Sequence, residues 1–292
     1  MRFGTKPQPS APRSLGILLA MRPTGFPFLD DGGPVLAFAH RGGARHPDLL
    51  GRENTMAAFT HATRLGYRYL ETDVHLTRDG VLVAFHDALL ERVTDGAGTL
   101  EQLDAADLAR VRVGGREPVP TLAELVTSFP DARFNLDLKS DAAVAPLAGF
   151  VAEQGLQDRV LVGSFSGRRL RRFRRLAGTR VATSASPGEV AAYAVLPSRL
   201  AGRVVRRPAA LQVPHRRGPL VVATAGLVRR AHAAGLQVHV WTVDDADAMR
   251  ALLDRGVDGL MTDRTDILAR VLHERGLWPE QRPGTAEERS DL

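Results

Sequence analysis

The sequence predicts an α/β fold, a (β/α)8 TIM barrel with a small insertion after the second strand. Apolar strand-like runs alternate with amphipathic helical stretches from residue 35 to about residue 273. About eight such units favour a parallel sheet closed into a barrel. Polar, reactive side chains follow several of the apolar runs, which is where barrel enzymes place their sites. A doubly wound open sheet is the alternative, although no Gly-x-Gly-x-x-Gly begins a helix after the first strand.

The first part of the chain carries clear signals for individual elements. Val35–Ala39 is apolar and predicts the first strand, and residues 67–73 predict the second. Between them we expect a helix from about Asn54 to Leu65, with Asn54 as its N-cap. Asp79-Gly80 then predicts a hairpin turn, with Val81–Phe85 as the return arm.

The remaining elements continue the alternation after an interruption. Residues 88–120 are rich in turn residues and predict an insertion with short helices. Thr121 and Glu124 form a capping box that begins the next helix, Thr121–Ser128. Further strands are expected at residues 134–139, 159–164, 180–184, 211–214, 237–242 and 259–262. The helices that alternate with them are expected at residues 142–153, 167–176, 187–195, 224–234, 244–254 and 265–272.

The bulk composition indicates one globular domain with two tails. We expect an N-terminal extension over residues 1–30, a barrel over 31–275 and a polar C-terminal tail over 276–292. The chain has no cysteine, which excludes a disulfide framework and thiolate metal ligands. No apolar run is long enough to cross a membrane, and residues 15–21 lack a signal-peptide cleavage pattern. We therefore expect a cytoplasmic location, with secretion as the lesser alternative.

The second predicted strand ends in two carboxylates. Glu71 and Asp73 are two residues apart, so both point to the same face of the strand. Two neighbouring carboxylates are costly to bury unless a cation lies between them, and a divalent metal ion is the simplest such cation. Asp137 and Lys139 share a face of a later strand in the same way, and Asp137 would add a third ligand. The alternatives are a hydrogen-bonded polar pair and an ordinary ion pair, respectively.

Two histidines and two cations complete the set of reactive groups. His40 and His86 each follow an apolar strand, and each can take up or release a proton near neutral pH. A structural hydrogen bond is the alternative for either histidine alone. Arg41 has the planar fork that suits phosphate, and Lys139 is one of only two lysines among 39 basic residues. A lysine in so arginine-rich a chain indicates a need for a compact ammonium group.

A stretch of arginines at residues 168–175 suggests two rival partners. On one helix face these side chains would bind an anionic membrane, or, with other arginines, nucleic acid. No aromatic interleaving or recognition motif supports nucleic acid. A solvated helix face is the simpler interpretation in a chain of formal net charge +6. We therefore expect neither a nucleic-acid partner nor stable membrane insertion.

Seven motifs of this chain resemble, in the same order, those of the glycerophosphodiester phosphodiesterase family. They are Ala39–Gly42, Glu53–Thr55, Glu71–Val74, Asp79-Gly80, Phe85–Asp87, Asp137–Lys139 and Val240–Thr242. Each motif alone is weak, but their order and their spread over residues 35–273 make the resemblance specific. It implies a TIM barrel that hydrolyses glycerophosphodiesters with the help of a divalent metal ion, Mg²⁺ or Ca²⁺.

The resemblance also implies roles for individual residues. It implies an acid–base pair of His40 and His86, metal ligands Glu71, Asp73 and Asp137 with Glu53 as a secondary candidate, and substrate contacts from Arg41, Lys139 and Trp241. Asp137 departs from the family pattern, which has Glu at this position. Its side chain is one methylene shorter, so it would reach less far toward the ion.

The expected reaction is metal-dependent hydrolysis of a small-molecule glycerophosphodiester to sn-glycerol 3-phosphate and an alcohol. One alternative keeps this chemistry and changes the substrate to a lipid, as in a lysophospholipase D. Another is a barrel that binds phosphodiesters without turnover, because the shorter Asp137 weakens the metal site.

Overall fold

Eight parallel strands form the centre of the molecule. The computed structural model describes residues 24–30, 33–196, 200–201 and 208–278. In spatial order the strands are β8 (Ala182–Thr183), β7 (Val160–Gly163), β6 (Arg133–Leu138), β2 (Tyr69–Leu76), β1 (Leu36–His40), β13 (Gly259–Thr262), β12 (Gln237–Trp241) and β9 (Ala210–Pro214). A parallel bridge between Ser184 and Ala210 joins the first strand of this row to the last. The sheet thus comes close to full closure, and the predicted (β/α)8 barrel is confirmed.

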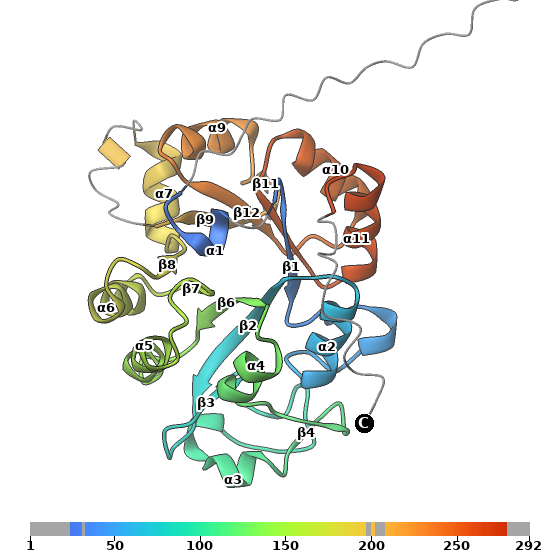
Figure 1. Ribbon diagram of the computed structural model, residues 1–292, viewed down its shortest axis with the longest axis vertical. Helices are drawn as coiled ribbons and strands as arrows, with labels where there is room; N and C mark the ends of the chain where they lie inside the picture. Colours follow the sequence, from blue (N-terminus) through green and yellow to red (C-terminus); the bar gives the residue numbers. More distant parts are fainter. Residues whose placement is uncertain (1–23, 31–32, 197–199, 202–207, 279–292) are drawn as a thin grey trace, which may run out of the picture.

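One helix follows each barrel strand and covers it from outside (Figure 1). These helices are α2 (Met56–Arg64), α4 (Leu122–Ser128), α5 (Val144–Glu153), α6 (Gly167–Ala177), α7 (Pro187–Val195), α9 (Ala225–Ala233), α10 (Ala246–Asp254) and α11 (Thr265–Glu274). The largest apolar cluster fills the space between strands and helices, with Phe59, Leu125 and Leu147 fully buried in it. Because both faces of the strands are buried, apolar residues occupy both faces of strands such as β1 and β7.

The beginning of α2 differs from the sequence prediction. Its N-cap is Thr55, whose hydroxyl accepts a hydrogen bond from the backbone N–H of Ala58, and not Asn54. Asn54 adopts a left-handed backbone conformation with φ 57°. Its side chain therefore turns into the barrel mouth and bonds to Thr72 and Asp73. A residue predicted to cap a helix thus holds a carboxylate in place.

The hairpin and the insertion after the second strand are both confirmed. β3 (Leu82–Ala84) pairs antiparallel with β2. The chain then forms η2 (Leu100–Gln102), α3 (Ala105–Leu108), β4 (Arg112–Val113) and β5 (Glu117–Pro118). These pieces surround an apolar cluster of their own that includes Phe85, Leu90 and Leu108. The capping box of Thr121 and Glu124 then begins α4, as predicted.

A short helix, α1 (Pro27–Asp30), closes the amino-terminal end of the barrel. Phe28 is fully buried against the ring of Tyr69, whose hydroxyl donates a hydrogen bond of 2.9 Å to the Phe28 carbonyl. Arg133, at the start of β6, donates to the carbonyl of Pro27. The predicted extension therefore includes residues that belong to the packing of the barrel, while residues 1–23 lie outside the described part.

Three smaller features complete the described chain. They are η1 (Pro47–Leu49), a hairpin of β10 (Arg216–Arg217) and β11 (Leu220–Val221), and the segment around Trp278 after α11. Within the predicted C-terminal tail, Trp278 packs edge-on against Tyr67, and residues 279–292 lie outside the described part. No helix among the described residues is long and apolar enough to span a membrane.

Candidate active site

The predicted reactive residues meet at the carboxyl ends of the barrel strands. In the sheet register His40 lies beside Glu71, and Asp73 lies beside Asp137. The strands alternate their side chains in step, so neighbours in the register point to the same side of the sheet. These side chains, which are far apart in sequence, therefore share the mouth of the barrel.

His40 is held between two carboxylates. Its Nδ1 is 2.6 Å from Oδ1 of Asp263, and its Nε2 is 3.8 Å from Oε2 of Glu71. Burial lowers the pKa of His40, but the attraction of Glu71 and then of Asp263 outweighs it, so the pKa of His40 is raised. Asp263 was not singled out from the sequence. Its position directly after an apolar strand, where His40 also stands, is the signal that would have found it.

His86 is held differently, on the loop that follows β3. Its Nδ1 is 2.5 Å from Oδ1 of Asp87, and Arg92 of the insertion pairs with the other oxygen of Asp87. His75 donates a hydrogen bond of 3.2 Å from Nε2 to the backbone carbonyl of His86, and its Nδ1 is 3.5 Å from Oε1 of Glu101. The pKa of His86 is lowered, chiefly by burial and then by the nearby cation Lys139. The two histidines are thus shifted in opposite directions.

The carboxylates of β2 and β6 gather around the ammonium group of Lys139. Nζ of Lys139 is 2.9 Å from Asp73 and 2.7 Å from Asp137. Burial would raise the pKa of Asp73, but Lys139 and Arg41 lower it further than burial raises it. Burial dominates at Asp137 and raises its pKa. Burial, together with the charge of Asp73, also raises the pKa of Glu71 to about 7.

The predicted metal ligands have the right chemistry but do not form a compact cage. Among the described residues, Glu71, Asp73 and Asp137 do not all come within 4.8 Å of one another. Lys139 holds the place between the two aspartates. The raised pKa of Glu71 shows that this carboxylate has less positive charge around it than its burial requires. A hard divalent cation beside buried carboxylate oxygens would supply that charge.

Arg41 begins a chain of ion pairs that leads to the insertion. Its Nε is 3.2 Å from Asp73, and its Nη1 donates a bond of 3.1 Å to Glu53. Both terminal nitrogens of Arg92 donate hydrogen bonds to the same Glu53, at 3.0 and 2.6 Å. The backbone of Arg41 is left-handed, with φ 50°, and its N–H donates to Oε2 of Glu71. Glu53, the secondary metal candidate, is therefore paired with two arginines.

An aromatic pair stands at the rim of the mouth. Trp241 ends β12, and its ring meets the ring of Phe165 edge-on at 5.6 Å. Phe165 is 63% exposed, and Nζ of Lys139 lies 5.9 Å from the centre of its ring. Phe165 was not predicted as a site residue. Its position two residues after the end of β7, at the carboxyl end of a barrel strand, is the signal that would have found it.

Fold and site together define a (β/α)8 barrel whose mouth brings two histidines, carboxylates and cations together. Two histidines with opposite pKa shifts lie beside buried carboxylates, an arginine and a lysine. Residues 40–267 match the model of the glycerophosphoryl diester phosphodiesterase family. The chain belongs to this family and is an enzyme, a phosphodiesterase.

Individual relatives agree with this assignment. The chain is 44% identical over 255 residues to the probable glycerophosphodiester phosphodiesterase 2 of Mycobacterium tuberculosis, which covers 86% of this chain and 95% of the relative. A putative glycerophosphoryl diester phosphodiesterase from Silicibacter pomeroyi shares the fold, with a TM-score of 0.72 at 24% identity over 87% of this chain and 100% of that one. An Oleispira antarctica phosphodiesterase, solved in complex with the product sn-glycerol-3-phosphate, has a TM-score of 0.66 at 24% identity, covering 82% of this chain and 96% of that one.

Proposed function

We propose that this protein hydrolyses glycerophosphodiesters to sn-glycerol 3-phosphate and an alcohol, with a divalent metal ion and with His40 and His86 as the acid–base pair. The observation that carries the proposal is the arrangement of the two histidines. Each is fixed at Nδ1 by its own carboxylate, Asp263 or Asp87, and each lies next to the buried carboxylates of the mouth. Such pairing fixes the tautomer and leaves Nε2 as the atom that exchanges a proton.

The opposite pKa shifts favour one distribution of the two roles. The lowered pKa of His86 favours its neutral imidazole, which can accept the proton of the attacking oxygen. The raised pKa of His40 favours its protonated form, which can donate a proton to the departing alcohol oxygen. A new bond then forms between phosphorus and the attacking oxygen, and the bond to the alcohol oxygen breaks. The attacking oxygen belongs either to water or to the neighbouring hydroxyl of the glycerol, which would give a cyclic phosphate first.

The phosphate group requires positive charge at the mouth. Arg41 and Lys139 would contact its non-bridging oxygens, and they would stabilise the charge that develops there. Glu71, Asp73 and Asp137 would hold the metal ion, which supplies Lewis-acid stabilisation of the same oxygens when bound. Trp241, with Phe165 beside it, would pack against the glycerol or the alcohol at the rim.

Turnover of glycerophosphocholine in the presence and absence of a chelator tests the proposal. We expect release of glycerol 3-phosphate that stops with chelator and returns with Mg²⁺ or Ca²⁺. His40→Ala and His86→Ala should each lose about 10²–10⁴-fold in kcat, whereas His273→Gln, an exposed histidine on α11, should keep full activity. No turnover with any divalent ion, or full activity in His40→Ala, would remove the proposal. A cyclic phosphate seen by ³¹P NMR during the reaction would identify the glycerol hydroxyl as nucleophile.

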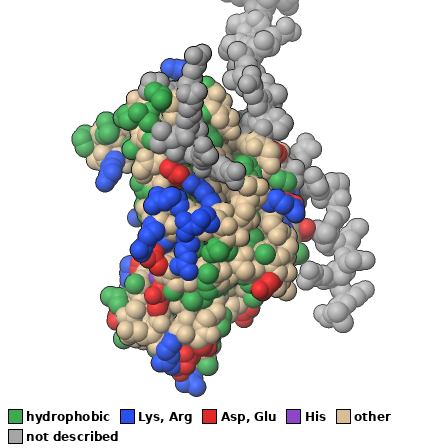
Figure 2. Space-filling model, turned by 90° about the vertical axis from the view of Figure 1, so that its left-hand side faces the viewer, with side chains coloured by type: hydrophobic (Ala, Val, Ile, Leu, Met, Phe, Trp, Pro, Cys, Tyr) green, Lys and Arg blue, Asp and Glu red, His purple; other side chains and the backbone are tan. Residues whose placement is uncertain are grey.

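The lipid-acting alternative depends on the arginine-rich surface of α6. Figure 2 shows basic side chains gathered on this face of the molecule. Arg168 and Arg169 pair with Asp141, and these three residues line one pocket with Arg171, Arg172 and Arg175. Lysophosphatidylcholine belongs in the same substrate panel. A kcat/KM for it above that for glycerophosphocholine would favour the lysophospholipase D activity.

A further inference from the structure

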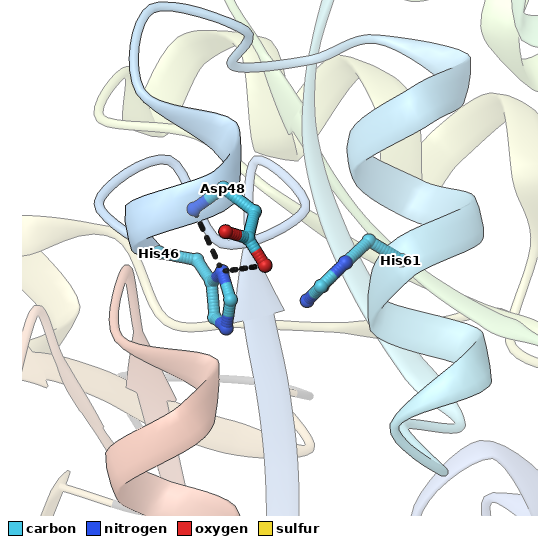
Figure 3. A group of neighbouring side chains, drawn as sticks. All are labelled: His46, Asp48 and His61. Atoms are coloured by element: carbon cyan, nitrogen blue, oxygen red, sulfur yellow. Dashed lines mark hydrogen bonds and ion pairs between the residues drawn. The ribbon is translucent and has the colours of Figure 1, made fainter.

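A second group of possible metal ligands lies outside the barrel mouth. His46 precedes η1, Asp48 lies within η1, and His61 lies on α2. One ligand atom from each comes within 4.8 Å of the other two. Figure 3 shows the Asp48 carboxylate beside His46 and facing the ring of His61. We propose that these three residues form a binding site for Zn²⁺ or a similar transition-metal ion, separate from the catalytic site.

The geometry around the two imidazoles supports this proposal. Their ring centres are 4.2 Å apart, and the ring planes are inclined by 53°. Nδ1 of His46 accepts a hydrogen bond from the backbone N–H of Asp48 and is 3.9 Å from Oδ2 of Asp48. Nε2 of His61 is buried, and it finds no hydrogen-bond partner within the described chain. A buried nitrogen left unpaired is costly, and a metal ion would use its lone pair.

The site is accessible to solvent. A cavity of about 420 Å³ lies beside Asp48 and His61, and the side chain of Asp48 is 75% exposed. Water can therefore enter and complete the coordination.

The donor set determines which ion is expected. Two imidazole nitrogens and one carboxylate with a place for water suit Zn²⁺, whereas Mg²⁺ and Ca²⁺ prefer oxygen ligands only. The catalytic mouth offers carboxylates and should therefore favour the hard ions. A bound Zn²⁺ would connect the loop after β1 to α2, and this loop also carries Arg41 and Glu53.

Binding of Zn²⁺ alone to chelator-stripped protein, with Mg²⁺ in excess, tests this proposal. Equilibrium dialysis and a thermal unfolding scan are recorded for the wild type, His61→Gln and Asp48→Asn, with His273→Gln as a matched control. We expect the wild type and the control to bind one Zn²⁺ that raises the unfolding temperature. Because loss of an outer-shell partner already costs about 10–100-fold in affinity, loss of a ligand should cost about 100-fold or more.

The variants also separate this site from the catalytic mouth. Asp48→Asn changes an exposed side chain and so keeps the test valid if His61→Gln does not fold. Asp137→Asn, which alters the mouth, should leave the Zn²⁺ affinity unchanged. Equal Zn²⁺ binding by the wild type, His61→Gln and Asp48→Asn would overturn the proposal. The proposal would also be overturned if only Asp137→Asn lost the Zn²⁺ ion, or if the wild type bound no Zn²⁺. Each of these results leaves the proposed phosphodiesterase reaction untouched, because that is measured separately.

Discussion

Replacing Asp263 with Asn removes one negative charge from the Nδ1 side of His40 and keeps an oxygen in the same place. In the wild type this contact is 2.6 Å long, and both side chains are only 15% exposed. Solvent therefore screens the pair weakly, and the carboxylate both orients the imidazole and stabilises its protonated form. The variant separates a charge effect from a change in packing, since the two side chains are nearly equal in size.

We expect a large decrease in kcat because the substitution changes both the pKa and the tautomer of His40. Without the charge of Asp263 the pKa of His40 falls, so less of the enzyme carries the proton that the leaving alcohol needs. The amide can also present its N–H₂ group to Nδ1, which would favour the wrong tautomer. Acid–base catalysis contributes about 10²–10⁴-fold, which corresponds to about 3–5 kcal/mol of the activation barrier. We expect kcat to fall within this range, with little change in KM.

The assay is the pH dependence of kcat for glycerophosphocholine. A group that must be protonated controls the alkaline limb of the profile, so this limb should move to lower pH in Asp263→Asn. Asp266→Asn is the matched control, because Asp266 pairs with Arg264 outside the mouth. An Asp263→Asn enzyme with wild-type kcat and an unmoved alkaline limb would refute the acid role of His40.

Three further predictions concern charge, the insertion and the barrel floor. The pKa of Glu71 is raised to about 7 in the folded state. Between about pH 4.5 and pH 7 the folded protein therefore keeps a proton on Glu71 that the unfolded chain has lost. The free energy of unfolding of the metal-free protein should decrease as the pH rises through this range. Glu71→Gln should remove this loss of stability, which amounts to up to about 3 kcal/mol. Chemical denaturation at several pH values measures it, and the same dependence of unfolding free energy on pH in both proteins would contradict the raised pKa of Glu71. Arg92→Leu should lower kcat about tenfold, which corresponds to about 1.36 kcal/mol of the activation barrier. It should cost only about 1 kcal/mol of unfolding free energy, because the side chain of Arg92 is 46% exposed. Phe28→Ala should cost about 3–5 kcal/mol of unfolding free energy and leave kcat/KM unchanged; a loss below about 1 kcal/mol would mean that α1 does not seal the barrel.

Alternation along each strand made much of the site predictable. The two-residue period placed Glu71 with Asp73 and Asp137 with Lys139, and parallel pairing then brought the two strands side by side. The period does not fix the register between strands. The ion pair of Lys139 with Asp137 was therefore foreseen only as an alternative to a metal ligand and a phosphate contact, while the contact of Lys139 with Asp73 appears only in the fold.

Contacts between distant segments could not be predicted from the sequence. Asp263 reaches His40 across 223 residues because β13 pairs with β1 when the barrel closes. Arg92 reaches Glu53 because the insertion folds back over the mouth, and turn-rich sequence carries no periodic signal for such a contact. Helix α1 has only four residues, too few to show any helical period.

The insertion has apolar packing that is distinct from that of the barrel, and this has an evolutionary consequence. Mutations inside such a unit can accumulate, and the unit can lengthen, without disturbing the strands that fix the catalytic geometry. What it cannot lose without cost are its attachments to the rest of the chain, among them Arg92 to Glu53, Glu101 to His75 and Asp104 to Arg78. Remodelling this segment would therefore change what lies beside Asp87 and Glu53 while the barrel strands stay the same.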